Sequence, residues 1–353
     1  MSPNLTSVTT TDLVTAEEPI LIAAVEGGGT SFKVTVCEVT DDEKVPQILH
    51  RIQIDSSHMD PKKCLSECAE FLRRHRPPQG YAALGIATFG PVGVRPDRPG
   101  IYGKILPTTP KVPWRNVDIL TPLREACQAY PDQDLPVKVD TDVNAAAFSE
   151  YIYFRRRDPH LTSCAYITVG TGVGAGLVIN GAPVIGRMHP EMGHVPVQPL
   201  PGDTFGGYSW GRERNPFGGV NEVEGLASSV ALTERYETMT GAPLGTLCRS
   251  VLGTLPDDHE LWDHAANALA NCCATLLLTV SIEKIVIGGG VMKRKCLINK
   301  IQQRTVEIIN GYLELPEDDM SSLITLSSYG DDAGMTGAIV MAQHIFLDAY
   351  KKK

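Results

Sequence analysis

The chain has 353 residues, 42% of them hydrophobic and 21% charged, and its formal net charge at pH 7 is −9. This length suggests two domains, and the composition is that of an ordinary globular protein whose core needs no disulfides. The negative charge argues against broad binding of nucleic acids or anionic membranes.

The N-terminal residues 1–18 lack both a basic segment and an apolar stretch, so they predict a flexible tail and no secretory signal. No apolar run reaches about 18 residues, so no membrane-spanning helix is expected. Nine cysteines without a Cys-x-x-Cys pair fit a reduced, cytoplasmic location.

Strands, turns and helices alternate along the chain, and the second half repeats the plan of the first less regularly. In the first half we predict strands at 21–25 and 33–39, a helix at 61–74, a strand at 82–87, loops at 90–113, a helix at 117–127, a strand at 136–139 and a helix at 144–154. In the second half we predict strands at 164–169 and 176–179, an irregular stretch at 186–219, helices at 224–238 and 261–281, a strand at 284–287, and helices at 296–311 and 334–350. The repeat predicts a duplicated α/β architecture.

Glycine-rich turns are the first candidates for binding an anion, because glycine lets backbone N–H groups approach a phosphate closely. None of them has the Gly-Lys-Ser/Thr ending of a Walker-type loop, and the first two do not open a helix after a single strand, which argues against a Rossmann dehydrogenase. The first turn comprises Gly27, Gly28, Gly29 and Thr30, the second Gly170, Thr171, Gly172 and Gly174, and a third run, Gly288, Gly289 and Gly290, could lie against a nucleotide.

An acidic cluster between the first two turns contains Asp142, which we interpret as a general base for transfer of a phosphoryl group to a sugar hydroxyl. The alternative is that Asp140 and Asp142 only form a turn and a helix cap. Asn144 could hold a sugar hydroxyl or cap its own helix. Glu26, beside the first turn, could bind Mg²⁺ directly or through water.

Glu191 and His194 follow the second turn three residues apart, and a carboxylate and an imidazole so spaced can both bind vicinal sugar hydroxyls. Such paired groups reject analogues that lack a hydroxyl. Glu224 is a further acidic candidate. The alternatives are a structural histidine in a surface turn and an ordinary helix start. Residues 331–334 could border the same cleft or cap the last helix.

A family resemblance rests on the order and combination of seven short runs. These are residues 23–30, 87–91, 109–116, 140–146, 189–194, 224–228 and 330–334. Together they resemble the ROK family of sugar kinases and sugar-responsive repressors, and they are most similar to its fructokinase branch. The resemblance covers nearly the whole chain after the N-terminal tail.

The resemblance implies an α/β protein with the actin-like ATPase (ribonuclease H-like) fold, in which two duplicated α/β domains enclose an interdomain cleft. It implies a small domain of residues 19–145, completed by the C-terminal helix 335–353, and a large domain of residues 146–334. The implied activity is ATP- and Mg²⁺-dependent phosphorylation of the 6-hydroxyl of a hexose, most closely D-fructose. A DNA-binding repressor role is not expected, because few residues precede the first strand.

The resemblance also implies roles for single residues. Asp142 matches the general base, the first two glycine turns match phosphate motifs, and Gly288, Gly289 and Gly290 match the adenosine motif. The implied sugar site consists of Gly90, Pro91, Asn144, Glu191, His194 and Glu224, with the loop-rich stretch 90–113 placed to cover the sugar.

Two departures from the family pattern affect these expectations. Many members bind a structural zinc through a histidine and cysteines, but no cysteine lies between Cys164 and Cys248, and residues 215–221 stand where ligands would fall. We therefore expect no zinc site and a loop 195–223 held by packing and hydrogen bonds, or mobile until sugar binds. Ser31 stands where the family often has lysine after the first turn.

Other functions stay open at this point. They are a kinase for mannose, glucose or an N-acetylhexosamine, a non-enzymatic sugar sensor, and a nicotinamide-dependent dehydrogenase. The intact Asp142 argues against a pure sensor, because binding alone needs no base. Because family members are often dimers, a homodimer is a further expectation.

Overall fold

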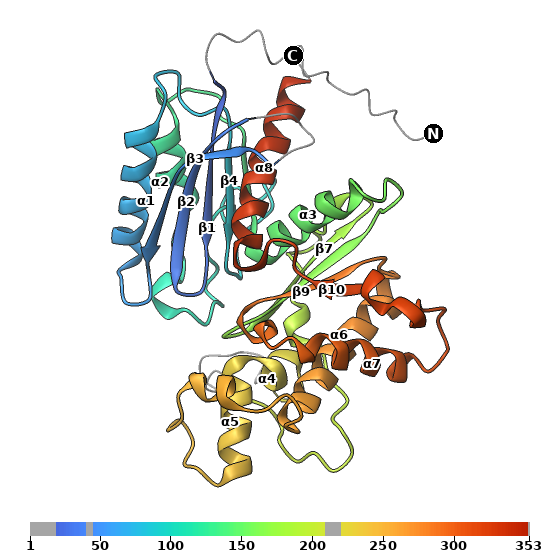
Figure 1. Ribbon diagram of the computed structural model, residues 1–353. Coiled ribbons are helices and arrows are strands. Elements are labelled where there is room, and N and C mark those ends of the chain that lie inside the picture. Colours follow the sequence, from blue (N-terminus) through green and yellow to red (C-terminus); the bar gives the residue numbers. More distant parts are fainter. Residues whose placement is uncertain (1–18, 40–44, 209–219, 352–353) are drawn as a thin grey trace.

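Two five-stranded sheets with helices packed on them form the core of the protein (Figure 1). The computed structural model describes residues 19–39, 45–208 and 220–351, so the predicted tail lies outside the described residues. The first sheet has the order β3-β2-β1-β4-β5, and the second has the order β10-β9-β6-β7-β8. The strands are β1 (Leu21–Gly27), β2 (Ser31–Glu38), β3 (Gln47–Asp55), β4 (Leu84–Thr88), β5 (Val137–Thr141), β6 (Cys164–Val169), β7 (Val173–Ile179), β8 (Ala182–Pro183), β9 (Ile285–Gly288) and β10 (Ile324–Leu326).

The two sheets have the same topology. In each, the first three strands pair antiparallel in sequence order, the fourth strand pairs parallel with the first, and the fifth pairs parallel with the fourth. The predicted duplication is therefore confirmed. The parallel strand β4 is buried along its whole length, as expected for a strand covered on both faces. The edge strand β3 was not predicted, because most of its side chains are exposed and mixed in character.

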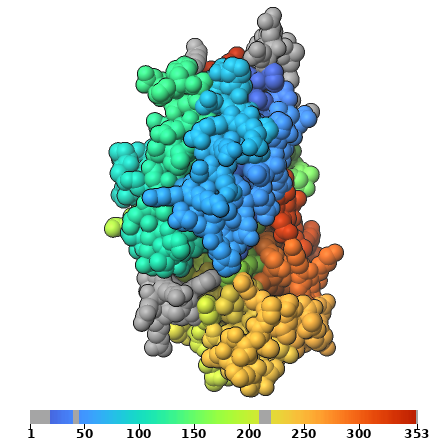
Figure 2. Space-filling model, turned by 90° about the vertical axis from the view of Figure 1, so that its left-hand side faces the viewer, coloured from blue at the N-terminus to red at the C-terminus, as the bar shows by residue number. Residues whose placement is uncertain are grey.

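The helices cover the outer faces of the two sheets and fill the space between them (Figure 1). Helices α1 and α2 pack on the first sheet, and α4, α6 and α7 surround the core below the second. Figure 2 shows the first half, in blue and teal, above the yellow and orange second half. The helices are α1 (Pro61–His75), α2 (Leu120–Cys127), α3 (Asp142–Arg155), α4 (Val223–Ala227), α5 (Ser229–Thr240), α6 (Leu261–Val280), α7 (Cys296–Ile309) and α8 (Ala333–Tyr350).

One predicted helix proves to be two. The single helix expected at 224–238 is broken into α4 and α5 at Ser228, whose backbone is extended with ψ 155°. The Ser228 side chain accepts a hydrogen bond of 3.2 Å from the N–H of Ala231 and so caps α5. The break turns Glu224 on α4 toward the second glycine turn, as described below.

Helices α3 and α8 cross between the two sheets and connect the two halves of the molecule. Helix α3 follows the last strand of the first sheet but packs on β6 and β7, whereas α8 packs on β1 and β4. The crossing is close, because a Cβ atom on Gly337 would lie 2.1 Å from the carbonyl oxygen of Ala145. The domain boundaries at 145/146 and 334/335 stay predictions. Among the described residues, no helix is long and apolar enough to cross a membrane.

Candidate active site

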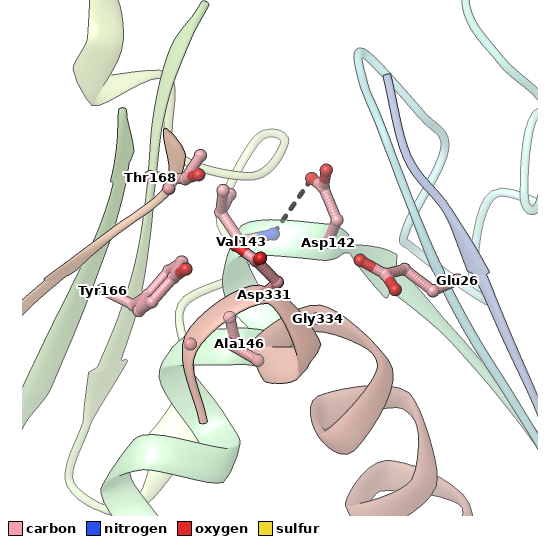
Figure 3. Close-up of a pocket in the computed structure, with 11 residues that line it drawn as sticks. Glu26, Asp142, Val143, Ala146, Tyr166, Thr168, Asp331 and Gly334 are labelled. Atoms are coloured by element: carbon pink, nitrogen blue, oxygen red, sulfur yellow. Dashed lines mark hydrogen bonds between the residues drawn. The ribbon is translucent and has the colours of Figure 1, made fainter. Parts of the chain in front are cut away.

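A polar cavity of about 150 Å³ lies where the two halves meet above the crossing of α3 and α8 (Figure 3). Both sheets, both helices and the turn before α8 contribute to its walls. The lining residues are Glu26, Asp142, Val143, Ala146, Tyr166, Thr168, Gly289, Gly330, Asp331, Ala333 and Gly334. The cavity therefore contains the predicted base, the predicted Mg²⁺ ligand and one glycine of the third run.

Asp142 is the first residue of α3, directly after β5. The helix is capped by the Thr141 hydroxyl, which accepts a hydrogen bond of 3.1 Å from the Asn144 N–H. Asp142 accepts one of 3.0 Å from the Val143 N–H. Burial raises the pKa of Asp142 to about 6, with a further contribution from the charge of Glu26, whereas Lys111 lowers it. A carboxylate with this pKa is ionised at neutral pH yet basic enough to accept a proton.

Glu26 lies beside Asp142 on one side of the cavity (Figure 3). Its carboxylate forms an ion pair of 2.9 Å with Lys33 of β2, and both side chains are largely buried. Burial raises the pKa of Glu26 despite this partner. Two neighbouring carboxylates offer the oxygen donors that suit Mg²⁺, so the residues present fit the expected ion.

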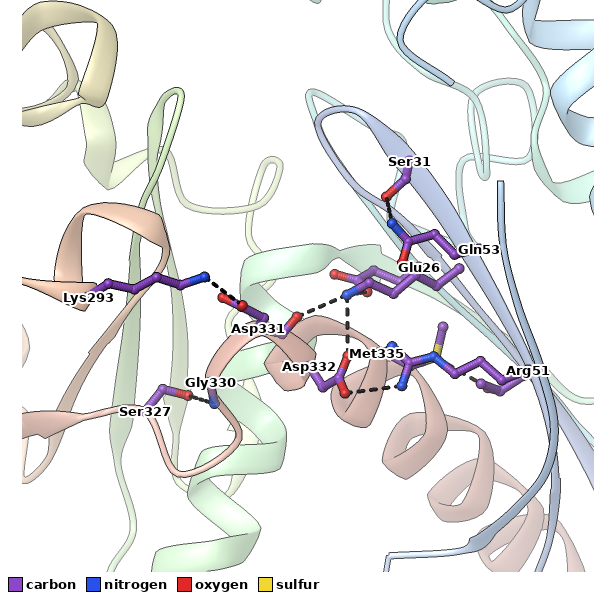
Figure 4. A network of polar contacts seen from close by, with 12 residues as sticks. Glu26, Ser31, Arg51, Gln53, Lys293, Ser327, Gly330, Asp331, Asp332 and Met335 are labelled. Carbon is purple, nitrogen blue, oxygen red and sulfur yellow. Dashed lines mark hydrogen bonds and ion pairs between the residues drawn. The ribbon is translucent and has the colours of Figure 1, made fainter. Parts of the chain in front are cut away.

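Ion pairs connect the start of α8 to both halves of the molecule (Figure 4). Lys33 donates a hydrogen bond of 2.9 Å to the backbone oxygen of Asp331. The Asp331 carboxylate forms an ion pair of 2.9 Å with Lys293 of the second half. Arg51 on β3 pairs with the Asp332 carboxylate at 2.5 Å. These contacts hold residues 331–334 at the border of the cavity.

The first glycine turn connects β1 to β2, and it is braced from outside. Within the turn, the Gly28 N–H donates 2.9 Å to the backbone oxygen of Ser31. The Lys111 ammonium donates to the backbone oxygens of both Gly28 and Gly29, at 3.0 Å each. Lys111 lies in the stretch 90–113, far from the turn in sequence, and no role was predicted for it.

The second glycine turn connects β6 to β7 and carries two contacts that the sequence did not predict. The Arg249 guanidinium donates 2.8 Å to the Thr171 hydroxyl. The Glu224 carboxylate accepts a hydrogen bond of 2.9 Å from the Val173 N–H. A Cβ atom on Gly172 would lie 2.4 Å from an oxygen of this carboxylate. Glu224 thus lies against the second turn, where it can connect a sugar site to a phosphate site.

The third glycine run lies at the end of β9. Gly289 has φ 94°, in the left-handed region that favours glycine, and a Cβ atom there would lie 2.5 Å from the backbone oxygen of Val169. This close approach brings the end of β9 against the end of β6, next to the second turn. The third run therefore lies next to the second turn, and of the three glycine-rich segments it is Gly289 that lines the cavity.

Glu191 lies close enough to His194, Glu224 and Asp142 for their charges to act on its pKa, although it does not line the cavity. Burial raises the pKa of Glu191 to about 7, the charge of His194 lowers it, and Glu224 and Asp142 raise it further. Burial alone would lower the pKa of His194, but the hydrogen bond and charge of Glu222 outweigh burial and raise it. The His194 Nδ1 atom lies 3.0 Å from the Glu222 carboxylate.

Gly90 and Pro91 approach this group through His189. A Cβ atom on Gly90 would lie 3.1 Å from the His189 ring, and His189 Nε2 accepts 3.2 Å from the Val92 N–H. Accepting at Nε2 puts the proton of the neutral ring on Nδ1, which lies 3.3 Å from Glu191. His189 therefore links the first half of the chain to Glu191.

Asn144 uses its side chain inside the protein, and it does not line the cavity. Its side chain is fully buried, and its amide donates to Asp140 at 2.9 Å and to the Val184 backbone at 3.2 Å. Its amide oxygen accepts 3.1 Å from the Leu177 N–H. Asn144 connects α3 to strands of both sheets, and it does not cap the helix, because Thr141 does.

Ion pairs and hydrogen bonds anchor the described parts of the loop 195–223. Asp203 pairs with Arg235 of α5 at 2.8 Å and with His264 of α6 at 3.1 Å. At the ends of the loop, Pro196 pairs with Glu222 in an antiparallel bridge. In the part of the chain that the structure describes, no three His, Cys, Asp or Glu side chains are grouped to hold a metal ion. Most of the run 215–221 lies outside the described residues.

Comparison with known proteins gives a consistent result. The sequence model of the ROK family matches residues 22–345. The chain is 33% identical to a fructokinase of Zymomonas mobilis, covering 91% of this chain and 96% of that protein. It is 32% identical to a putative fructokinase of Bacillus subtilis, covering 91% of this chain and 95% of that protein.

Among solved structures, a ROK family glucokinase of Streptomyces griseus in complex with glucose and AMPPNP is similar, with a TM-score of 0.66 and 18% identity over 92% of this chain and 99% of that chain. At this identity the likeness shows the fold alone. The fold is therefore the α/β fold of actin-like ATPase type expected from the sequence.

Proposed function

Because the chain belongs to the ROK family, we propose that it is an ATP-dependent sugar kinase that phosphorylates the 6-hydroxyl of a hexose, with D-fructose as the preferred substrate. The observation that carries this proposal is Asp142, an ionisable carboxylate in a cavity that is also lined by Glu26, next to the first glycine turn, and by Gly289 of the third glycine run. The fructokinases among its relatives, about 30% identical over most of the chain, support fructose.

Transfer requires the hydroxyl, the base and the phosphorus to meet in the cleft. In our proposal, Glu191, His194 and Glu224 bind the sugar hydroxyls, Gly90 and Pro91 border the sugar, and the glycine turns bind the phosphates of ATP. Asp142 accepts the proton of the 6-hydroxyl as its oxygen bonds to the γ-phosphorus and the bond from phosphorus to the bridging oxygen of ADP breaks. Mg²⁺ bound with ATP would be held by Glu26, directly or through water, and would neutralise phosphate charge.

Closure of the two halves about the α3–α8 crossing would exclude water from this site. Exclusion of water limits wasteful hydrolysis of ATP and strengthens the electrostatic contacts in the cleft. The stretch 90–113 belongs to the first half, and its contact through Val92 and His189 with Glu191 supports its role as a cover for the sugar.

The test is ATP consumption with Mg²⁺ against fructose, mannose, glucose and N-acetylhexosamines, with identification of the phosphorylated product. We expect the largest kcat/KM with fructose and fructose 6-phosphate as the product. Larger kcat/KM with another hexose would keep the reaction and change the substrate. Sugar binding without turnover on any sugar would contradict the kinase and favour a sensor. A homodimer and a cytoplasmic location stay predictions.

A further inference from the structure

Lys111 is held against the first glycine turn by contacts that fix both its backbone and its ammonium group. It directly precedes the short 3₁₀ helix Val112–Trp114, and the Trp114 ring stacks on Phe32 of β2 with centroids 4.9 Å apart. Its ammonium donates to the backbone oxygens of Gly28 and Gly29 at 3.0 Å each. The position of the charge is therefore set by the fold and not by a flexible side chain.

In the part of the chain that the structure describes, no carboxylate touches this ammonium group. Its Nζ atom lies 3.4 Å from the centroid of the Phe89 ring, and among the described residues no carboxylate forms an ion pair with it. Two of its three N–H donors face carbonyl oxygens, which carry only partial charge. An ammonium group that touches only carbonyl oxygens and an aromatic ring can also bind an anion that arrives with a substrate. Burial lowers the pKa of Lys111 to about 8, which leaves it mostly protonated at neutral pH.

The same group lies near the predicted base. The charge of Lys111 opposes the burial and the Glu26 charge that raise the pKa of Asp142, so the two groups are close enough for their charges to interact. The first turn has no basic residue of its own, since it reads Glu26 to Ser31 without lysine or arginine. Lys33, the next basic residue, is paired with Glu26. Lys111 is therefore a cation that both contacts the first turn and acts electrostatically on Asp142.

We propose that Lys111 is a further catalytic residue, which binds the transferring γ-phosphoryl group and stabilises its negative charge as it passes from ADP to the sugar oxygen. This inference rests on the proposed kinase function. The phosphorus leaves the bridging oxygen of ADP and bonds to the 6-oxygen, whose proton goes to Asp142. Lys111 keeps its protons throughout and contacts the non-bridging oxygens. Such a fixed charge stabilises the transition state without reorganisation.

A purely structural role for Lys111, as a brace for the turn, makes different predictions. Lys111→Gln keeps an N–H₂ donor but removes the charge, whereas Lys111→Arg keeps the charge. We expect Lys111→Gln to lower kcat by about 10²–10³-fold, the usual cost of one lost electrostatic donor. The kcat of Lys111→Arg should be at least about tenfold higher than that of Lys111→Gln. Lys104→Met, in the same stretch, is the control and should stay within threefold of wild type.

The pH profile gives a readout that a brace would not move. The positive charge of Lys111 favours the carboxylate of Asp142, so its removal makes that group easier to protonate. The acid limb of kcat should therefore move to higher pH in Lys111→Gln and stay in place in Lys111→Arg. If Lys111→Gln stays within threefold of wild type with an unmoved limb, the charge has no catalytic role and the proposal is wrong.

A binding measurement separates this inference from the kinase proposal. By calorimetry with Mg²⁺, Lys111→Gln should bind ATP about tenfold more weakly than wild type, yet bind ADP within twofold, because only ATP carries the γ-phosphate. If Lys111→Gln loses affinity equally for ATP and ADP, or for neither, Lys111 does not contact the γ-phosphate. If the wild-type protein phosphorylates no sugar, but Lys111→Gln still loses affinity for ATP and not for ADP, the kinase proposal is wrong and the phosphate contact stands.

Discussion

The pKa of Asp142 leads to a quantitative prediction for the pH dependence of catalysis. With a pKa of about 6, the carboxylate fraction is about 0.9 at pH 7 and about 0.1 at pH 5, so kcat should fall about tenfold between them. Asp142→Asn should lower kcat by about 10²–10⁴-fold, the usual contribution of a general base, and its residual activity should lack this limb.

The same shift predicts the opposite effect on stability. The folded pKa lies above the ordinary value of 3.8, so the carboxylate destabilises the fold progressively between about pH 4 and pH 6 and fully at pH 7. Asp142→Asn removes that charge, so its Tm at pH 7 should equal or exceed that of wild type. Loss of activity without loss of stability distinguishes a catalytic group from a structural one.

The assay is steady-state kinetics from pH 5 to 8 at saturating ATP and sugar, with a melting curve at each pH. Glu191 is the matched control, because its pKa of about 7 could produce a neighbouring limb. Glu191→Gln should keep the limb near pH 6, whereas Asp142→Asn should lose it. A wild-type rate that is flat down to pH 5, or an Asp142→Asn variant within tenfold of wild type, would refute the assignment of the base.

Two further predictions concern the walls of the cleft. Glu222→Gln removes the charge that raises the pKa of His194, so this pKa should fall as burial becomes dominant; NMR titration of the imidazole would measure it, and an unchanged value would contradict the pairing. Asp203→Asn leaves the Arg235 guanidinium buried without its carboxylate and should cost about 3–5 kcal/mol in the free energy of unfolding; urea denaturation would measure it, and a loss below about 1 kcal/mol would show that the pair does not hold the loop.

The sequence predicted the architecture well, for reasons visible in single elements. The strand β4 is a continuous apolar run, and α1 has Asp60 as its cap and Pro61 at its start, so local signals alone identify both. The order of the elements in the two halves was enough to predict a duplicated fold. The boundary at Ser228 was missed, because a serine inside a helical pattern caps a helix only if the chain turns there.

For the site, the sequence identified residues that lie next to glycine turns or at strand ends. Asp142, Glu26 and the glycines are of this kind, because a strand end fixes where the next residue points. Lys111 and Arg249 were missed, since each reaches a turn from a loop far away in the chain and carries no local signal. Asn144 was assigned to sugar by its place in a motif, whereas its amide is used inside the protein.

The sequence by itself thus determined the family, the two α/β halves and the chemical types that line the cleft, because periodicity, glycine turns and strand ends are local properties of the chain. Only the tertiary structure decided which of these groups meet. The crossing of α3 and α8 brings Glu26, Asp142 and Gly289 to one cavity, and burial there raises the pKa of Asp142. Burial and the distance between charges depend on the whole fold, so no short stretch of sequence contains them.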